Sequence, residues 1–194
     1  MRTLKVIEFM SLDGVVQAPG DPDEDRDGGF AHGGWQRPYF DEIFLQQAGP
    51  GIASTDAQLF GRRTYEKMAA FWPHQGDDDP FARHLNHVQK YVASRTMTGT
   101  TWGPTTILSG DVATQVRELK EQKGGTISVL GSPGLVQTLM AHDLVDEYAL
   151  AIHPVVLGSG KRLFGDAEKV CRLELVSCVT TTTGVLMSTY RPVR

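Results

Sequence analysis

Apolar and polar positions along the chain switch between two periods, and the switches mark out strands and helices. From Leu4 to Met10 the alternation predicts a strand that ends at the turn formed by residues 11–14. Further strands are predicted from alternation or short apolar runs at 56–60, 91–94, 105–109, 127–130, 147–157, 173–179 and 185–190.

Helical spacing of apolar residues separates most of these strands. It predicts helices at 38–47, at 64–70, after Asp79, after Asp111 and after Ser132, where a polar residue can cap the helix start. This alternation predicts an α/β fold: a mostly parallel sheet of about eight strands with helices on both faces and an antiparallel edge. No repeat or linker divides the chain, so we expect a single domain over residues 1–194.

Composition narrows the function classes. The chain is 40% hydrophobic and 22% charged, which is typical of a globular protein, and its net charge of -4 argues against nucleic acid as a partner. Cys171 and Cys178 are too few for a disulfide framework. The most apolar stretch, 148–157, is about half the ~20 residues that span a bilayer, so we expect a cytoplasmic protein. We also expect its partner to be a small-molecule substrate.

Residues 18–37 depart from the alternation because they combine glycines and prolines with a run of acids. A solvated surface loop and a mobile loop over an active site both remain open interpretations. Asp23, Asp25 and Asp27 match the start of a calcium-binding loop, but Gly34 stands where that loop needs a glutamate. We therefore expect no calcium, and no histidine or cysteine spacing predicts another metal site.

A first candidate phosphate-binding segment lies where the strand 56–60 meets a helix. Gly61 lets the backbone approach a ligand, and Thr64 can cap the helix or bond an oxyanion. Arg62 and Arg63 oppose the helix dipole unless an anion lies over the helix start. Solvated arginines without a partner explain this segment equally well.

Two further segments follow strand ends. Ser94 and Arg95 come after the strand 91–94 with a composition that suits a ribose phosphate, and Gly131, Ser132 and Gly134 open a helix whose free amides can cradle a pyrophosphate. Each alone is an ordinary turn. Because the carboxyl ends of parallel strands meet at one edge of a sheet, all three segments are expected to converge there.

The ordered set of motifs resembles the dihydrofolate reductase-like superfamily. The matching motifs are residues 11–14, 61–66, 94–96, 131–132, 144–148 and 153–158. Within it, the chain is most similar to the group related to the C-terminal reductase domain of the bifunctional riboflavin-biosynthesis deaminase/reductase. The resemblance implies a three-layer α/β fold, NADPH as the hydride donor, and a homodimer.

The resemblance also assigns cofactor-binding roles. It places Gly61, Arg62 and Thr64 on the adenosine phosphates, Ser94 and Arg95 on the 2′-phosphoribose, and Gly131, Ser132 and Gly134 on the pyrophosphate. We expect NADPH to be preferred over NADH, because Arg62 and Arg95 can pair with a 2′-phosphate.

The proton donor is sought on the helix after the first strand, where dihydrofolate reductases carry an acid against the pterin ring. This chain offers Asp41 and Glu42 there, and we take Asp41 as the catalytic candidate. Its aromatic neighbours would raise the pKa of its carboxyl, which could then relay a proton. Solvation of both acids is the alternative, and Asp13 is a further polar contact whose ordinary role is turn chemistry.

These inferences predict an NADPH-dependent reductase that transfers a hydride to a small heterocyclic substrate. The substrate would be pteridine- or pyrimidine-like, as in dihydrofolate reductase or 5-amino-6-(5-phosphoribosylamino)uracil reductase. Two alternatives remain: a non-catalytic NADP-binding regulatory protein, and a flavin or nitro-group reductase.

Overall fold

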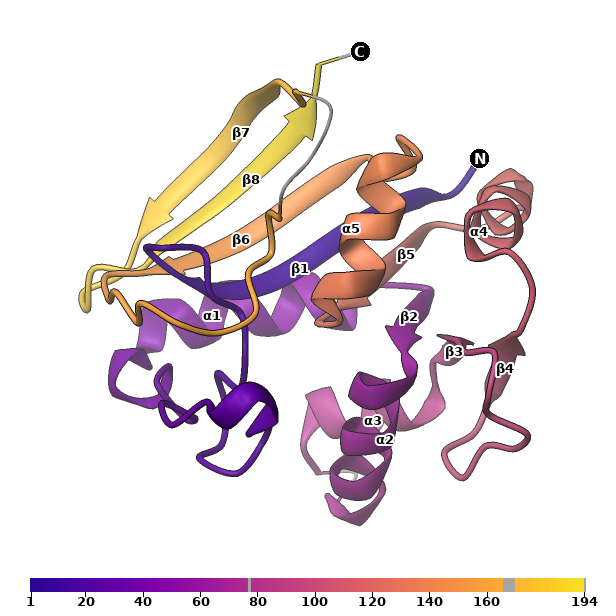
Figure 1. Ribbon diagram of the computed structural model, residues 1–194, viewed down its shortest axis with the longest axis horizontal. Helices are drawn as coiled ribbons and strands as arrows, with labels where there is room; N and C mark the ends of the chain where they lie inside the picture. The colour runs from indigo at the N-terminus through magenta and orange to yellow at the C-terminus, as the bar shows by residue number, and fades with distance from the viewer. Residues whose placement is uncertain (77, 166–169, 194) are drawn as a thin grey trace.

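The computed structural model describes residues 1–76, 78–165 and 170–193. These residues form an eight-stranded sheet with the order β4-β3-β2-β5-β1-β6-β8-β7 (Figure 1). The strands are β1 (Thr3–Ser11), β2 (Ala57–Gly61), β3 (Gln89–Ala93), β4 (Thr105–Leu108), β5 (Thr126–Leu130), β6 (Glu147–His153), β7 (Leu173–Thr180) and β8 (Leu186–Pro192).

The expected α/β class and the eight strands are confirmed, and the sheet is mixed. The pairs from β4 across to β6 are parallel, whereas β8 runs antiparallel to both β6 and β7. The strand predicted at 147–157 ends early, at His153, because the chain there leaves the sheet through Pro154.

The helices are α1 (Glu42–Ala53), α2 (Arg62–Phe71), α3 (Pro80–His87), α4 (Val112–Glu121) and α5 (Pro133–Ala141), with short 3-10 turns η1 (Asp27–Gly29), η2 (Arg37–Tyr39) and η3 (Trp72–His74). The helix predicted at 38–47 is wrong in its bounds. Pro38 lies in the separate turn η2, Phe40 is extended, and α1 then begins at Glu42. Across the described residues, no helix has the length and apolar character needed to traverse a membrane.

Successive residues of the central strands face two separate apolar clusters. Val6 on β1 packs in a cluster with Val116 of α4 and Leu139 of α5. Its neighbour Ile7 packs in a second cluster with residues of α1, α2 and α3. In Figure 1, α5 crosses β1 and β5 on the side of the viewer, and α1 lies on the far side.

The parallel strands bring the expected phosphate-binding segments to one edge of the sheet. The helix α2 begins at Arg62, immediately after β2, and α5 begins at Pro133, shortly after β5 ends at Leu130. The strand β3 ends at Ala93, immediately before Ser94. The carboxyl ends of these strands therefore position the candidate site.

Candidate functional site

The hydroxyl of Ser132 joins the starts of α2 and α5. It accepts a hydrogen bond from the Gly61 N–H at 2.8 Å and donates one to Thr64 Oγ1 at 2.7 Å. Ser132 precedes α5 as expected, but the expectation that its side chain caps this helix is wrong. The backbone of Ser132 is left-handed (φ 70°, ψ 65°), and its side chain makes no hydrogen bond to the amides of α5. The hydroxyl is turned toward α2 instead.

Two glycines of this junction leave little room for a side chain. A Cβ on Gly61 would lie 3.0 Å from Ser132 Oγ, and one on Gly131 would lie 3.2 Å from Thr64 Cγ2. Gly131 also has a φ of 70°, a backbone conformation that side chains disfavour. The lack of a Cβ at these residues therefore lets the two helix starts approach closely without displacing Ser132 or Thr64.

The arrangement leaves amide donors free at both helix starts. Neither α2 nor α5 has a side-chain cap, and the N–H groups of a first helical turn have no acceptor within their own helix. In α5 these groups belong to Gly134 and Leu135, since Pro133 has none. Such paired helix starts favour an anion through both the free donors and the helix dipoles.

A cleft of about 520 Å³ opens beside this junction. Four expected cofactor-binding residues line it: Gly61, Ser94, Arg95 and Gly134. Its opposite wall is formed by residues 108–112, between β4 and α4. Thr64, Gly131 and Ser132 are not in its lining; of these, Ser132 binds the Gly61 amide and is itself bonded to Thr64.

The arginines expected near the phosphates have different surroundings. Arg62 is outside the cleft lining and pairs with Glu66, one turn further along α2, at 3.0 Å. Arg95 lines the cleft, is exposed, and forms no ion pair within the described ranges. The loop that carries it is held by Ser94 Oγ, which accepts hydrogen bonds from the amides of Thr96 and Met97. Arg95 is therefore the cation best placed for a ligand in this cleft.

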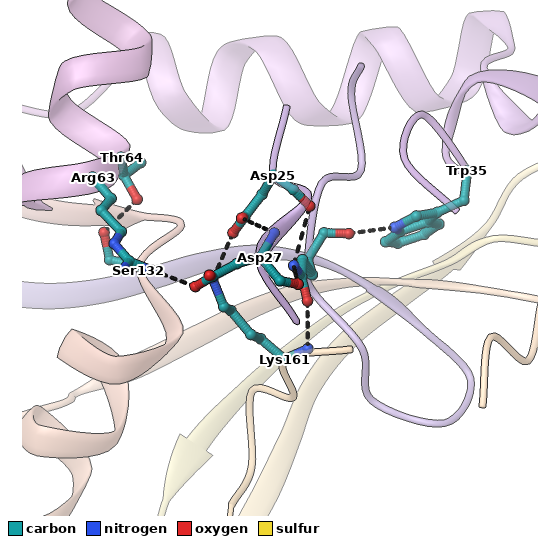
Figure 2. A network of polar contacts seen from close by, with 8 residues as sticks. Asp25, Asp27, Trp35, Arg63, Thr64, Ser132 and Lys161 are labelled. Carbon is teal, nitrogen blue, oxygen red and sulfur yellow. Dashed lines mark hydrogen bonds and ion pairs between the residues drawn. The ribbon is translucent and has the colours of Figure 1, made fainter. Parts of the chain in front are cut away.

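The acidic segment 18–37 is pinned beside the junction of α2 and α5, as Figure 2 shows. Asp27 accepts from Arg63 at 2.5 Å and pairs with Lys161 at 2.9 Å, and Asp25 pairs with Lys161 at 2.8 Å. Hydrogen bonds from Lys161 and Arg63 lower the pKa of Asp27. Buried Gln17 donates to the backbone carbonyls of Asp25 and Asp27. The segment is thus tied to the rim of the site by its acids.

Asp41 caps α1 rather than lying within it. Its Oδ1 accepts from the Phe44 amide at 2.7 Å, and its Oδ2 accepts from the hydroxyl and the amide of Thr182 at 2.6 and 2.7 Å. The hydrogen bond from the Thr182 hydroxyl, followed by that from the Phe44 amide, lowers the pKa of Asp41. The expected raised pKa is therefore wrong, because these donors favour the charged carboxylate.

Asp13 is fully engaged in holding the chain after β6. Its carboxylate accepts from the Ser11 hydroxyl at 2.7 Å and from the amides of Leu157 and Gly158 at 3.1 and 2.9 Å. The Ser11 hydrogen bond is the main cause that lowers its pKa. Asp13 therefore anchors the 153–158 motif, in keeping with its turn chemistry.

His153, which was not among the site residues expected from the sequence, is fully buried at the end of β6. Its Nδ1 lies 3.0 Å from the Ala151 carbonyl, while Nε2 has no hydrogen-bond partner in the described part of the chain. The rings of Trp35, Tyr39 and Phe44 surround it, with centroids 5.1 to 5.9 Å away. Burial lowers the pKa of His153. The signal available in the sequence was its place in the 153–158 motif.

Known structures share this fold. A putative riboflavin biosynthesis protein from Shewanella sp. PV-4 is similar with a TM-score of 0.67 and 19% identity, over 99% of both chains. The dihydrofolate reductase of Enterococcus faecalis, solved with NADP(H), is similar with a TM-score of 0.62 and 13% identity, over 99% of this chain and 97% of that one. The fold is that of the dihydrofolate reductase-like superfamily, as expected.

The sequence itself identifies the family. The model of the RibD C-terminal domain matches residues 2–187, so the chain belongs to that family. The uncharacterized protein YyaP of Bacillus subtilis (strain 168) is 32% identical over 138 residues, which cover 70% of this chain and 73% of YyaP.

The Ser132 junction leads to a first prediction. Ser132→Ala removes one acceptor and one donor, so the free energy of unfolding is expected to fall by about 1–2 kcal/mol in urea titrations. Ser54→Ala is the control, because Ser54 is exposed and makes one local bond of 3.2 Å. Equal stability of the two variants would contradict the role assigned to the junction.

Asp41 leads to a second prediction, on acid stability. Since its pKa is lowered in the folded protein, Asp41 stabilises the fold above the unfolded carboxyl pKa of about 3.9, and this contribution is lost as the pH falls. Asp41→Asn is expected to lower the melting temperature at neutral pH and to flatten its acid dependence. The matched control is exposed Glu42→Gln, and identical melting curves for both variants would refute the capping role.

Proposed function

We propose that this protein is an NADPH-dependent reductase that transfers a hydride to a small heterocycle of the pteridine or pyrimidine type. Membership of the RibD C-terminal domain family and the dihydrofolate reductase-like fold point to a reductase. The observation that carries the proposal is the junction of two uncapped helix starts beside the cleft that holds Arg95.

The residues of the cleft fit a dinucleotide phosphate. The amides of Gly134 and Leu135 would bind the pyrophosphate, since both residues line the cleft. Gly61, whose amide is held by the Ser132 hydroxyl, would let a phosphate approach the start of α2. When bound, NADPH supplies the hydride, and the protein supplies position and a water-excluding wall.

The preference for NADPH over NADH rests mainly on Arg95. Arg95 is exposed in the cleft and forms no ion pair in the described ranges, although Asp111 also lines the cleft, so a 2′-phosphate would give it a charge-assisted partner. Arg62 would first have to leave Glu66. It is therefore expected to contribute less.

The half-buried rings of Tyr39 and Phe9, which pack with the buried Phe44, would form the wall for a flat substrate. Tyr39, Phe44 and Phe9 pack on the α1 side of β6, opposite the face against which α5 packs. A planar ring packs favourably against such side chains. Asp41 is not proposed as the proton donor, because its lowered pKa leaves it ionised at neutral pH.

Cofactor titration is a third prediction. Arg95→Ala is expected to raise the dissociation constant for NADPH about tenfold and to leave that for NADH unchanged, since only NADPH carries the 2′-phosphate. The effect of Arg62→Ala is expected to be smaller. The exposed helix residue Arg117, changed to Ala, serves as the control. Equal loss of both cofactors in Arg95→Ala would contradict the assignment.

Turnover separates a reductase from a non-catalytic binder. The protein is mixed with NADPH and a panel of pteridines and pyrimidines, and the loss of nicotinamide absorbance is followed. Oxidation of NADPH with one of these heterocycles is expected. Tight binding of NADPH without oxidation by any heterocycle in the panel would favour the regulatory alternative.

A homodimer is proposed through the exposed edge strand β7. This strand ends the sheet, and its Leu175, Val176 and Val179 are exposed. An apolar edge with open backbone groups is suited to pair with a second copy of itself.

The dimer provides a fourth prediction. Val176→Lys is expected to convert a dimer into a monomer in light scattering after size exclusion, because lysine on an edge strand opposes pairing. Leu45→Lys, at an equally apolar exposed position on α1, is the control. A wild-type monomer would refute the proposed dimer.

A further inference from the structure

Glu8 is a buried carboxyl group that the proposed function does not use. It lies within β1 and is 4% exposed. Its Oε1 is buried without a hydrogen-bond partner, and burial raises the pKa of Glu8 to about 8. A buried charge without a partner is costly, so the group is held uncharged near neutral pH.

The position of Glu8 relates it to the candidate site. The last β1–β5 pair is Ile7 with Leu130, so Glu8 is level with Gly131, where the turn into α5 begins. Adjacent strands lie about 4.8 Å apart. On its other side Glu8 pairs with Leu150 of β6. Glu8 therefore lies beside the start of the turn into α5, although it is not in the lining of the cleft.

Among the residues that the structure describes, the surroundings of Glu8 show no ionic partner. It shares a face of β1 with Val6 and Met10, which pack in the apolar cluster under α5. The titratable side chain of β6 in that cluster is Tyr148, whose pKa is raised by burial and which is therefore uncharged. No residue of β5 or α5 carries a charge.

Leu163 also belongs to this cluster. The two charged residues that directly precede it in the chain form ion pairs elsewhere. Lys161 pairs with Asp25 and Asp27, and Arg162 pairs with Asp13. An unpartnered buried polar group needs an explanation, and a ligand that completes its hydrogen bonds is one.

A neutral carboxyl group has a specific complement. It presents an O–H donor and a C=O acceptor side by side. An amide edge, with N–H beside C=O, matches both groups at once. The carboxamide of nicotinamide has this edge, and so does the lactam of an oxidised pterin or pyrimidine.

We propose that Glu8 is a recognition residue of the reductase site, which binds an amide group of the ligand through a pair of hydrogen bonds. The inference rests on the proposed function and adds to the proposed site a residue of the central strand β1. The amide group could belong to the cofactor or to the substrate, and the test distinguishes the two.

Two variants and one control test this role. Glu8→Gln keeps a neutral donor and acceptor but cannot ionise, whereas Glu8→Leu removes both hydrogen-bonding groups at similar volume. Glu147→Gln is the matched control, since Glu147 lies at the opposite end of β6 and pairs with Lys5 at 2.9 Å. Affinities for NADP⁺ and for adenosine 2′,5′-bisphosphate, which lacks nicotinamide, are measured at about pH 6 and about pH 10.

If the amide belongs to the cofactor, wild-type affinity for NADP⁺ is expected to be about tenfold weaker at the higher pH than that of Glu8→Gln. Glu8→Leu is expected to be weak at both values. The bisphosphate is expected to bind equally to wild type and all variants. If these differences appear instead in the KM of the reducible heterocycle, the amide belongs to the substrate.

A purely structural role gives a different result. Because the raised pKa keeps Glu8 neutral in the fold, its contribution to stability is present below about pH 4.5 and is lost as the pH rises through about 8, so both variants should melt higher than wild type above that value. Such a shift without any change in NADP⁺ affinity or KM would overturn the recognition role and leave the reductase intact. Absence of NADP⁺ binding to wild type would overturn the proposed function and this inference together.

Discussion

The hydrogen bonds of the Ser132 hydroxyl are the contact on which the candidate site depends. They fix the start of α5 to the start of α2, two elements from distant parts of the chain. By turning toward α2, the hydroxyl leaves the amides of its own helix without a cap. The start of α5 is therefore less stable than a capped one, and a negatively charged ligand bound there would stabilise it. Gly61 and Gly131 suit this contact, since a side chain on either would press on Ser132 or Thr64.

Charge around the site is distributed so that Arg95 stays available. The chain has a net charge of -4, and its acidic segment lies beside the phosphate-binding edge, which by itself would repel an anion. Arg63 and Lys161 neutralise Asp25 and Asp27, and Arg62 is paired with Glu66. Arg95, on a separate loop, remains for the ligand. Cofactor preference is therefore expected to depend on this one residue more than on the number of basic residues nearby.

The sequence predicted those elements that depend on interactions between residues close together in the chain. The alternation of residues 4–10 and the caps Asp79 and Asp111 correspond to β1, α3 and α4, because strand faces and helix caps depend on neighbours a few residues away. The bonds of Ser132 to Gly61 and of Asp41 to Thr182 span 71 and 141 residues. Such partners cannot be read from spacing, which is why the side-chain cap at Ser132 and the raised pKa of Asp41 were wrong. The position of Ser132 before its helix was right, whereas Asp41 was expected within the helix 38–47 and instead precedes α1.

The buried polar atoms that lack partners extend this reasoning to the ligand. In the described chain they belong to Arg2, Glu8 and His153. Arg2 precedes β1, at the end away from the site, whereas Glu8 and His153 lie on the adjacent strands β1 and β6 toward the candidate edge. Glu8 faces the α5 side, where the cleft lies, and His153 faces the aromatic rings on the α1 side. The two incomplete polar groups therefore face opposite sides of the sheet, and a ligand that completes either one would have to reach it from its own side.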